Sequence, residues 1–149
     1  MIIIIDTREQ NPLSFKSMGV EEVVETLPVG DYTAKGQESE VVIERKELGD
    51  LWTSYSTGYD RERAKILKAK ESGIQFVLAV EGTCWQLRSG FQFWNGKELI
   101  THKKDGLSMI RQLMTVSRKY GIQVWFCDGR RDMAFRIKEY LLSKERIKK

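Results

Sequence analysis

The residues of this chain that could do chemistry are two carboxylates and an amine, Asp31, Glu44 and Lys46. Glu44 and Lys46 directly follow the β-branched run 41–43, which predicts a buried strand. Side chains alternate faces along a strand, so Glu44 and Lys46 should point one way and Arg45 the other. We expect Asp31 on the neighbouring strand. A carboxylate pair beside an amine can hold a divalent metal next to a group that handles protons or stabilises charge.

Three further acidic residues could join this pair, namely Asp6, Glu9 and Asp50. For Asp50, at the expected start of a helix, plain N-terminal capping is an alternative role. Four or five carboxylates that converge on one strand end require a hard cation, and oxygen ligands favour Mg²⁺, with Mn²⁺ as a substitute. Lys46 would then stabilise the transition state or help to activate a water. A salt-bridged strand end without a metal is the plainer alternative.

Basic residues near these acids are suited to phosphate. Arg8, Arg45 and Arg61 carry guanidinium groups that match phosphate oxygens, although each could instead form a surface salt bridge. The net charge of +4 and the pI near 9.1 are too modest to identify a nucleic-acid binder by themselves. A basic tail at 144–149 adds to the local positive charge, and many such tails are only solvated ends.

Composition limits the class of protein. A chain of 149 residues with 41% hydrophobic and 31% charged residues is long enough for one domain with a substantial core. The sequence has no apolar run of about 20 residues and no signal peptide, which predicts an intracellular protein without a membrane partner. The cysteines, Cys84 and Cys127, stand singly among apolar residues and are expected to be buried thiols. A single histidine and no paired cysteines argue against a zinc site.

Hydrophobic periodicity predicts one mixed sheet covered by helices. The expected strands are 1–5, 76–80 and 122–127, with a hairpin of 27–34 and 40–45. The expected helices are 20–25, 48–72 with an interruption near 56–58, 107–120, and a last helix that buries Met133, Ile137 and Leu141.

Residues 83–104 are interpreted as an insertion that carries an aromatic hairpin. Asn95-Gly96 between two apolar segments is typical of a type I′ turn. Its aromatic residues, Phe91, Phe93 and Trp94, could cover the core, form a dimer contact or act as a wedge against DNA. Cover for the core is the plainest of the three interpretations.

Several blocks of the sequence resemble the nuclease domain of the XPF/Hef family. That family has Gly-Asp, a variable gap, Glu-Arg-Lys, three residues and then Asp. Here the same pattern reads Gly30-Asp31, Glu44-Arg45-Lys46, Glu47-Leu48-Gly49 and Asp50. Blocks that surround it also match, namely 2–9, 27–32, 54–61 and 80–82. The resemblance is close over about residues 1–82 and holds only in outline beyond them.

The resemblance implies a restriction-endonuclease-like fold and Mg²⁺-dependent cleavage of branched, flapped or junction DNA. By position, Asp31 and Glu44 would be metal ligands and Lys46 the catalytic lysine. The supporting acids would be Asp6, Glu9 and Asp50, and the arginines that brace the site or hold phosphate would be Arg8 and Arg45. Family members usually continue into tandem helix-hairpin-helix motifs, so residues 1–149 are expected to be a stand-alone version. A homodimer is also expected by family analogy.

Two other functions stay open from the sequence. One is a non-catalytic DNA-binding or scaffold subunit on the same fold, although inactive members of such families typically lose the Glu-Arg-Lys acids, which are present here. The other is a different hydrolase on the same core, such as an RNA nuclease or an exonuclease.

Overall fold

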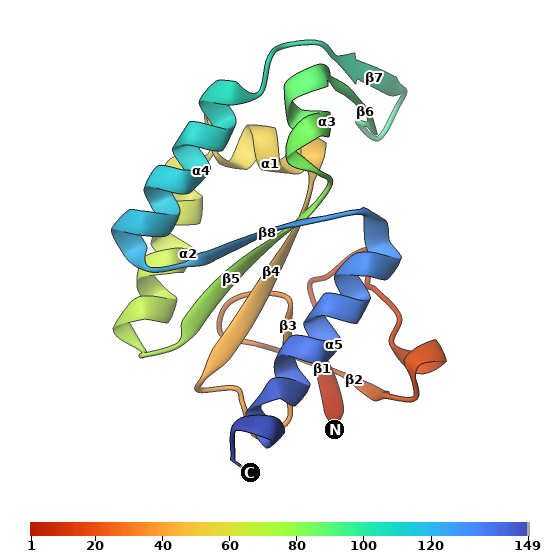
Figure 1. Ribbon diagram of the computed structural model, residues 1–149, viewed down its shortest axis with the longest axis vertical. Helices are drawn as coiled ribbons and strands as arrows, with labels where there is room; N and C mark the ends of the chain where they lie inside the picture. Colours follow the sequence, from red (N-terminus) through yellow and green to blue (C-terminus); the bar gives the residue numbers. More distant parts are fainter. Residues whose placement is uncertain (149) are drawn as a thin grey trace.

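A computed structural model describes residues 1–148 and contains one six-stranded mixed sheet with helices on both faces, as expected (Figure 1). The sheet order is β2-β1-β3-β4-β5-β8, and β6 pairs only with β7. The strands are β1 (Ile2–Asp6), β2 (Glu21–Glu25), β3 (Tyr32–Ala34), β4 (Val41–Glu47), β5 (Gln75–Glu81), β6 (Phe91–Trp94), β7 (Leu99–His102) and β8 (Gln123–Cys127). The helices are the 3₁₀ turn η1 (Lys16–Met18) and α1 (Leu48–Ser54), α2 (Tyr59–Glu71), α3 (Cys84–Ser89), α4 (Leu107–Tyr120) and α5 (Gly129–Ile147).

Strand direction explains why one edge of the sheet collects charged residues. The pairs β1–β2, β4–β5 and β5–β8 are parallel, whereas β3 runs antiparallel to both of its neighbours, β1 and β4. The amino end of β3 therefore lies at the same edge as the carboxyl ends of β1, β4 and β5. The loop residue Asp31 enters β3 at this edge, where Asp6, Glu44 and Glu81 also lie.

The sheet separates two hydrophobic cores, and the alternation along β4 assigns its side chains to them. Val42 packs in the core beneath α1, α2, α3 and α4, whereas Ile43 packs in the core beneath α5. Figure 1 shows α2 and α4 on one side of the sheet and α5 on the other. The last helix buries Met133, Ile137 and Leu141, as predicted.

The helix predicted over 20–25 is wrong, because Glu21–Glu25 forms the edge strand β2 in parallel register with β1. Val23 and Val24 are β-branched, which favours an edge strand of a sheet. The spacing of apolar residues over only six positions does not distinguish such a strand from a helix. The interrupted helical segment and the other strands are confirmed within a few residues, and the hairpin is confirmed with a shorter first strand: β3 is only Tyr32–Ala34, so residues 27–31, Asp31 included, form a loop rather than the predicted strand. No helix in the part of the chain that the structure describes is long and apolar enough to span a membrane.

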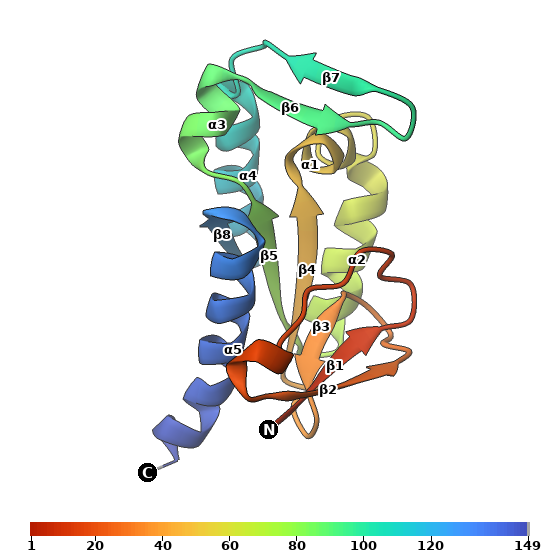
Figure 2. The ribbon, with the colours of Figure 1, turned by 90° about the vertical axis from the view of Figure 1, so that its right-hand side faces the viewer.

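The segment 83–104 contains helix α3 as well as the expected hairpin β6–β7, which lies over α1 (Figure 2). Phe91 is buried and the ring of Phe93 packs directly on Gly49 of α1, so these two aromatic residues cover the core. Trp94 is 65% exposed. The turn is not type I′, because only Gly96 has a positive φ and that type needs two such residues.

Two smaller expectations are corrected. The described part of the basic segment, residues 144–148, is not a free tail, since α5 extends to Ile147, and Lys144 and Arg146 form ion pairs with Glu40 and Glu139, respectively. Lys149 lies outside the described residues. Cys127 is buried as expected, but Cys84 at the start of α3 is exposed.

Gly30, which precedes the site residue Asp31, gives a test of this fold. It has φ 79°, and a Cβ there would lie 2.2 Å from Val42 Cγ2. We expect Gly30→Ala to lower the free energy of unfolding by about 3 kcal/mol or more, since strain and a core clash add. Gly36→Ala is the control: its φ is also positive, at 85°, but nothing lies within 4 Å. It should cost about 1 kcal/mol. Equal losses in urea denaturation would contradict the packing at Gly30.

Candidate active site

Asp31 is held at the sheet edge by the backbones of both neighbouring strands. Its N–H donates to the carbonyl of Ile43 at 2.9 Å, and its carbonyl accepts the N–H of Asp6 at 2.8 Å. Its carboxylate Oδ2 accepts the N–H of Arg45 at 2.8 Å. Because Glu44 lies between Ile43 and Arg45 on β4, these three bonds hold the Asp31 carboxyl group beside Glu44.

Burial makes this carboxylate pair electrostatically costly. Desolvation, followed by the charge of Glu44, raises the pKa of Asp31 to about 7. The N–H of Arg45 and the ammonium of Lys65 oppose the rise without cancelling it. Since Glu44 is itself only 5% exposed, the pair carries negative charge that the surrounding protein does not fully balance.

Lys46 lies on the same face of β4 as Glu44, as predicted. Its Nζ is 3.9 Å from Glu44 Oε1 and 3.3 Å from Oε1 of Glu62, a buried residue of α2. Lys65, also on α2, places its Nζ 2.8 Å from Glu44 Oε1 and 3.2 Å from Glu62 Oε1. Burial by itself would lower the pKa of Lys65, but the two glutamates raise it above its usual range. Lys46 and Lys65 thus each lie between Glu44 and Glu62, next to Asp31.

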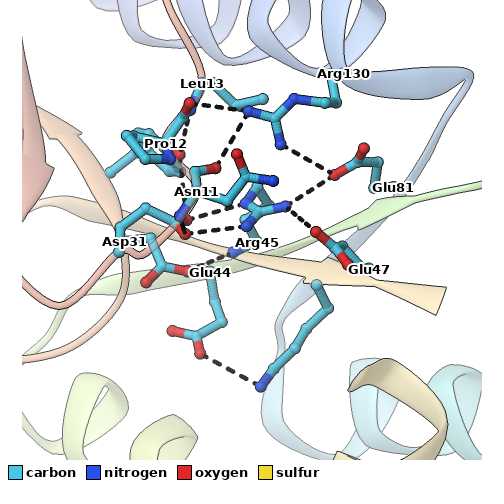
Figure 3. Close-up of polar contacts among 12 residues, drawn as sticks. Asn11, Pro12, Leu13, Asp31, Glu44, Arg45, Glu47, Glu81 and Arg130 are labelled. Atoms are coloured by element: carbon cyan, nitrogen blue, oxygen red, sulfur yellow. Dashed lines mark hydrogen bonds and ion pairs between the residues drawn. The ribbon is translucent and has the colours of Figure 1, made fainter. Parts of the chain in front are cut away.

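Arg45 points to the opposite face of the sheet, where it is enclosed by acids (Figure 3). Its Nε and Nη2 each lie 3.0 Å from the carboxylate of Glu9, and its Nη1 lies 2.8 Å from Glu81 and 3.3 Å from Glu47. The side chain is 8% exposed, and burial alone would lower its pKa, but Glu9 and Glu47 raise it above its usual value. Of the two roles that the resemblance implies for Arg45, the geometry favours bracing over phosphate binding.

Asp6 and Glu9 are engaged by arginines and do not reach the Asp31–Glu44 pair as ligands. Arg8 Nε and Nη2 donate to Asp6 at 2.8 and 3.1 Å, and the N–H of Leu27 donates to it at 2.8 Å. Burial alone would raise the pKa of Asp6, yet these bonds lower it. The pKa of Glu9 is lowered in the same way by Arg45. Both acids stay ionised and join the loops after β1 to the sheet.

Two adjoining hollows of about 500 and 320 Å³ open at this edge, and Asp31 and Glu44 line both. The smaller hollow also includes Lys46 and the exposed Asp50, which lies in the first turn of α1 without capping it. The larger hollow is basic on balance: its cationic lining residues are Arg8, Arg61, Lys65 and Lys68, and its acidic ones are Asp6, Asp31 and Glu44. The predicted positions of Asp50 and Arg61 beside the carboxylate pair are therefore observed.

The number of carboxylates available as ligands determines how a metal ion could be held at this edge. Among residues 1–148, no group of three or more Asp, Glu, His or Cys side chains is close enough to hold a metal ion. The expected carboxylates do gather around the two hollows, but they do not form one set of metal ligands, because arginines engage Asp6 and Glu9. Asp31 and Glu44 still fit Mg²⁺, which is usually held by one or two carboxylates together with waters and substrate phosphates. The raised pKa of Asp31 reflects charge that a cation would neutralise.

Sequence reasoning missed the contribution of α2. Glu62 and Lys65 complete the charge arrangement around Lys46. Lys68 lines the basic hollow, and its Nζ donates to the carbonyl of Pro28 at 2.9 Å. A signal was present, since Arg61, Lys65 and Lys68 have the i, i+4, i+7 spacing of one helix face. That spacing does not say which face meets the sheet.

The mixed sheet with helices on both faces, and with paired carboxylates and a lysine at one edge, agrees with the expected restriction-endonuclease-like fold. The model of the ERCC4 domain matches residues 5–139, so the chain belongs to the ERCC4 domain family, a family of structure-specific DNA endonucleases. A search among curated proteins finds no match.

Solved structures agree with this assignment. XPF from Aeropyrum pernix matches with a TM-score of 0.72 at 20% identity, covering 98% of this chain and 66% of that chain. The structure of XPF from Aeropyrum pernix in complex with DNA matches with a TM-score of 0.69 at 21% identity, covering 97% and 65%. The expected fold class and the XPF resemblance are confirmed. The chain spans about two thirds of the length of these structures.

The raised pKa of Asp31 predicts how stability depends on pH. Between about pH 4, the usual value for an unfolded Asp, and about pH 7 the folded state binds the proton more tightly, so stability should fall as pH rises. In metal-free buffer with a chelator, Asp31→Asn should raise the free energy of unfolding by about 2–4 kcal/mol at pH 8 and change it little at pH 4.

Glu71→Gln, the same change of charge at an exposed position of α2, is the control for net charge. It should show no such pH-dependent gain in urea denaturation. If Asp31→Asn stabilised the protein equally at both pH values, the buried pair would not be the source.

Proposed function

We propose that this protein is a metal-dependent DNA endonuclease that hydrolyses phosphodiester bonds in branched, flapped or junction DNA. The single observation that carries this proposal is the Asp31–Glu44 pair with Lys46, held at one sheet edge and open to a basic hollow. Membership of the ERCC4 domain family supports it. The XPF structure in complex with DNA supports nucleic acid as the partner. The expected intracellular location stays a prediction.

Each residue has a role that follows from its surroundings. Asp31 and Glu44 would hold Mg²⁺, which when bound supplies Lewis-acid chemistry at a phosphate oxygen and makes a water more acidic. The ammonium of Lys46 stabilises negative charge that develops on the phosphate. Arg8 and Arg61 hold backbone phosphates in the larger hollow. Asp6, Glu9 and Arg45 keep the loops after β1 and the ends of β4 and β5 in place.

Purified protein incubated with flap, fork and Holliday-junction DNA should cleave at least one of them with Mg²⁺ or Mn²⁺ and none with a chelator. Asp31→Ala, Glu44→Ala and Lys46→Ala should each lower the rate about a hundredfold or more, since the first two remove a carboxylate that would hold the metal and the third removes the ammonium that stabilises the developing charge. Glu71→Ala on the exposed side of α2 should keep the rate within about twofold. Undiminished cleavage by Asp31→Ala, in protein with an unchanged circular dichroism spectrum, would refute these roles.

The same assay tests the alternative of a non-catalytic subunit. Such a subunit would bind structured DNA without cutting it and would show no Mn²⁺ binding that depends on Asp31. Blocked DNA ends and RNA substrates distinguish endonuclease action on DNA from exonuclease or RNA nuclease activity.

We also propose a homodimer through the face formed by β8 and α5. β8 is the last strand of the sheet and has an unpaired edge among the described strands. Beside it lies an apolar hollow that includes Trp125 and Tyr140, next to Phe135, which is 53% exposed. An apolar patch next to an open strand edge is typical of a protein–protein interface.

Sedimentation equilibrium should show a dimer that Phe135→Glu converts to a monomer, since a charge would have to be buried in the interface. Trp94→Glu is the matched control at an exposed aromatic residue of the other candidate surface, the hairpin. If Trp94→Glu alone dissociates the dimer, the hairpin is the interface instead.

A further inference from the structure

One lysine outside the Glu-Arg-Lys motif binds the carboxylate that would hold the metal. Lys65 Nζ lies 2.8 Å from Glu44 Oε1, which makes this the shorter of the two lysine contacts to that oxygen; Lys46 is 3.9 Å away. The Glu44 side chain is 7% exposed and that of Lys65 is 35% exposed. The contact thus joins a buried acceptor to a donor with one side open to the hollow.

Glu62 holds both lysines in place from beneath. Its Oε1 lies 3.3 Å from Lys46 and 3.2 Å from Lys65, and its other oxygen, Oε2, is buried without a hydrogen-bond partner. The negative charges of Glu44 and Glu62 are balanced by the positive charges of Lys46 and Lys65. Asp31 is the carboxylate left over, so the metal-free site is near neutrality only if Lys65 stays where it is.

We propose that Lys65 is a built-in counter-ion that competes with the divalent metal for Glu44, so that metal binding requires its ammonium to leave Glu44 Oε1. This inference rests on the proposed metal site. An ammonium hydrogen-bonded to a carboxylate oxygen occupies the direction from which a cation would approach. A dication on the same carboxylate would also repel the lysine strongly at this separation and depth.

The fold gives the displaced ammonium somewhere to go. Lys65 has a flexible four-carbon stem and lines the larger hollow together with Arg61 and Lys68 of the same helix face. Glu62 can keep hold of the ammonium while Glu44 is released. The lysine then faces the hollow in which a DNA phosphate would lie, whereas in the metal-free protein it stabilises the carboxylate pair.

Calorimetric titration of the full chain with Mn²⁺ alone near pH 8 tests this directly. A second titration near pH 9 shows whether protons compete with Mn²⁺ for the carboxylates. Lys65→Met should bind Mn²⁺ about tenfold more tightly than the wild type, because the competitor is gone. Lys65→Arg, which keeps the charge, should stay within about twofold. Lys68→Met removes a charge from the same hollow without touching Glu44, and should also stay within about twofold.

A second measurement separates competition from packing. In chelator, Lys65→Met should unfold at a lower urea concentration than Lys68→Met, and saturating Mn²⁺ should close that gap. If Lys65→Met binds Mn²⁺ no more tightly than the wild type, or if Lys68→Met gains as much, the proposal is overturned.

The two proposals fail in different ways. Wild-type Mn²⁺ binding that Asp31→Asn abolishes but Lys65→Met leaves unchanged would overturn the counter-ion role and leave the nuclease proposal standing. No Mn²⁺ binding by the wild type, with no cleavage of any DNA, would overturn both.

Discussion

The backbone of three adjacent strands forces two like charges together, and the rest of the site is arranged around that constraint. Asp31 is fixed by bonds to the strands on both sides, so its carboxyl group cannot move away from Glu44. The consequence is the raised pKa of Asp31, which burial and Glu44 produce together. A protein gains no stability from such a pair, so its presence at an open sheet edge supports the proposed cation site.

Strand alternation gives β4 two separate tasks. Glu44 and Lys46 face α2, where the chemistry is proposed to occur. Arg45 faces the other way and is surrounded by Glu9, Glu47 and Glu81, so it links the loop after β1 to the ends of β4 and β5. A rigid ion-pair cluster behind the strand end keeps the reactive side chains in position.

The helix α2 supplies positive charge to the acidic edge of the sheet. The carboxyl edge carries mainly negative charge, and cations must come from elsewhere if the metal-free protein is to be stable. Lys65 contacts Glu44 directly, while Arg61 and Lys68 extend the positive surface along the same helix face. In the proposed role of Lys65, metal binding displaces this ammonium from Glu44 and leaves it facing the hollow where a phosphate would lie.

Local sequence determined the strands, most helices and the identity of the central pair, because hydrophobic period and strand alternation are short-range properties. The pattern of Glu44, Arg45 and Lys46 predicted which side chains share a face, and it did so correctly. The same short-range reasoning failed at 20–25, where strand pairing with β1 overrides a helical spacing. It also grouped Asp6 and Glu9 with the Asp31–Glu44 pair as acids that converge on a cation, because the sequence does not show that Arg8 and Arg45 form ion pairs with them.

Tertiary structure alone decided the balance of charge. Glu62 and Lys65 are separated from Glu44 by a loop and a helix, and their contact depends on how α2 is rotated against the sheet. That rotation follows from packing of Ile66 and Ala69 into the core, which is a long-range outcome. The sequence by itself therefore determined which residues could react, and the three-dimensional packing decided which cations neutralise them.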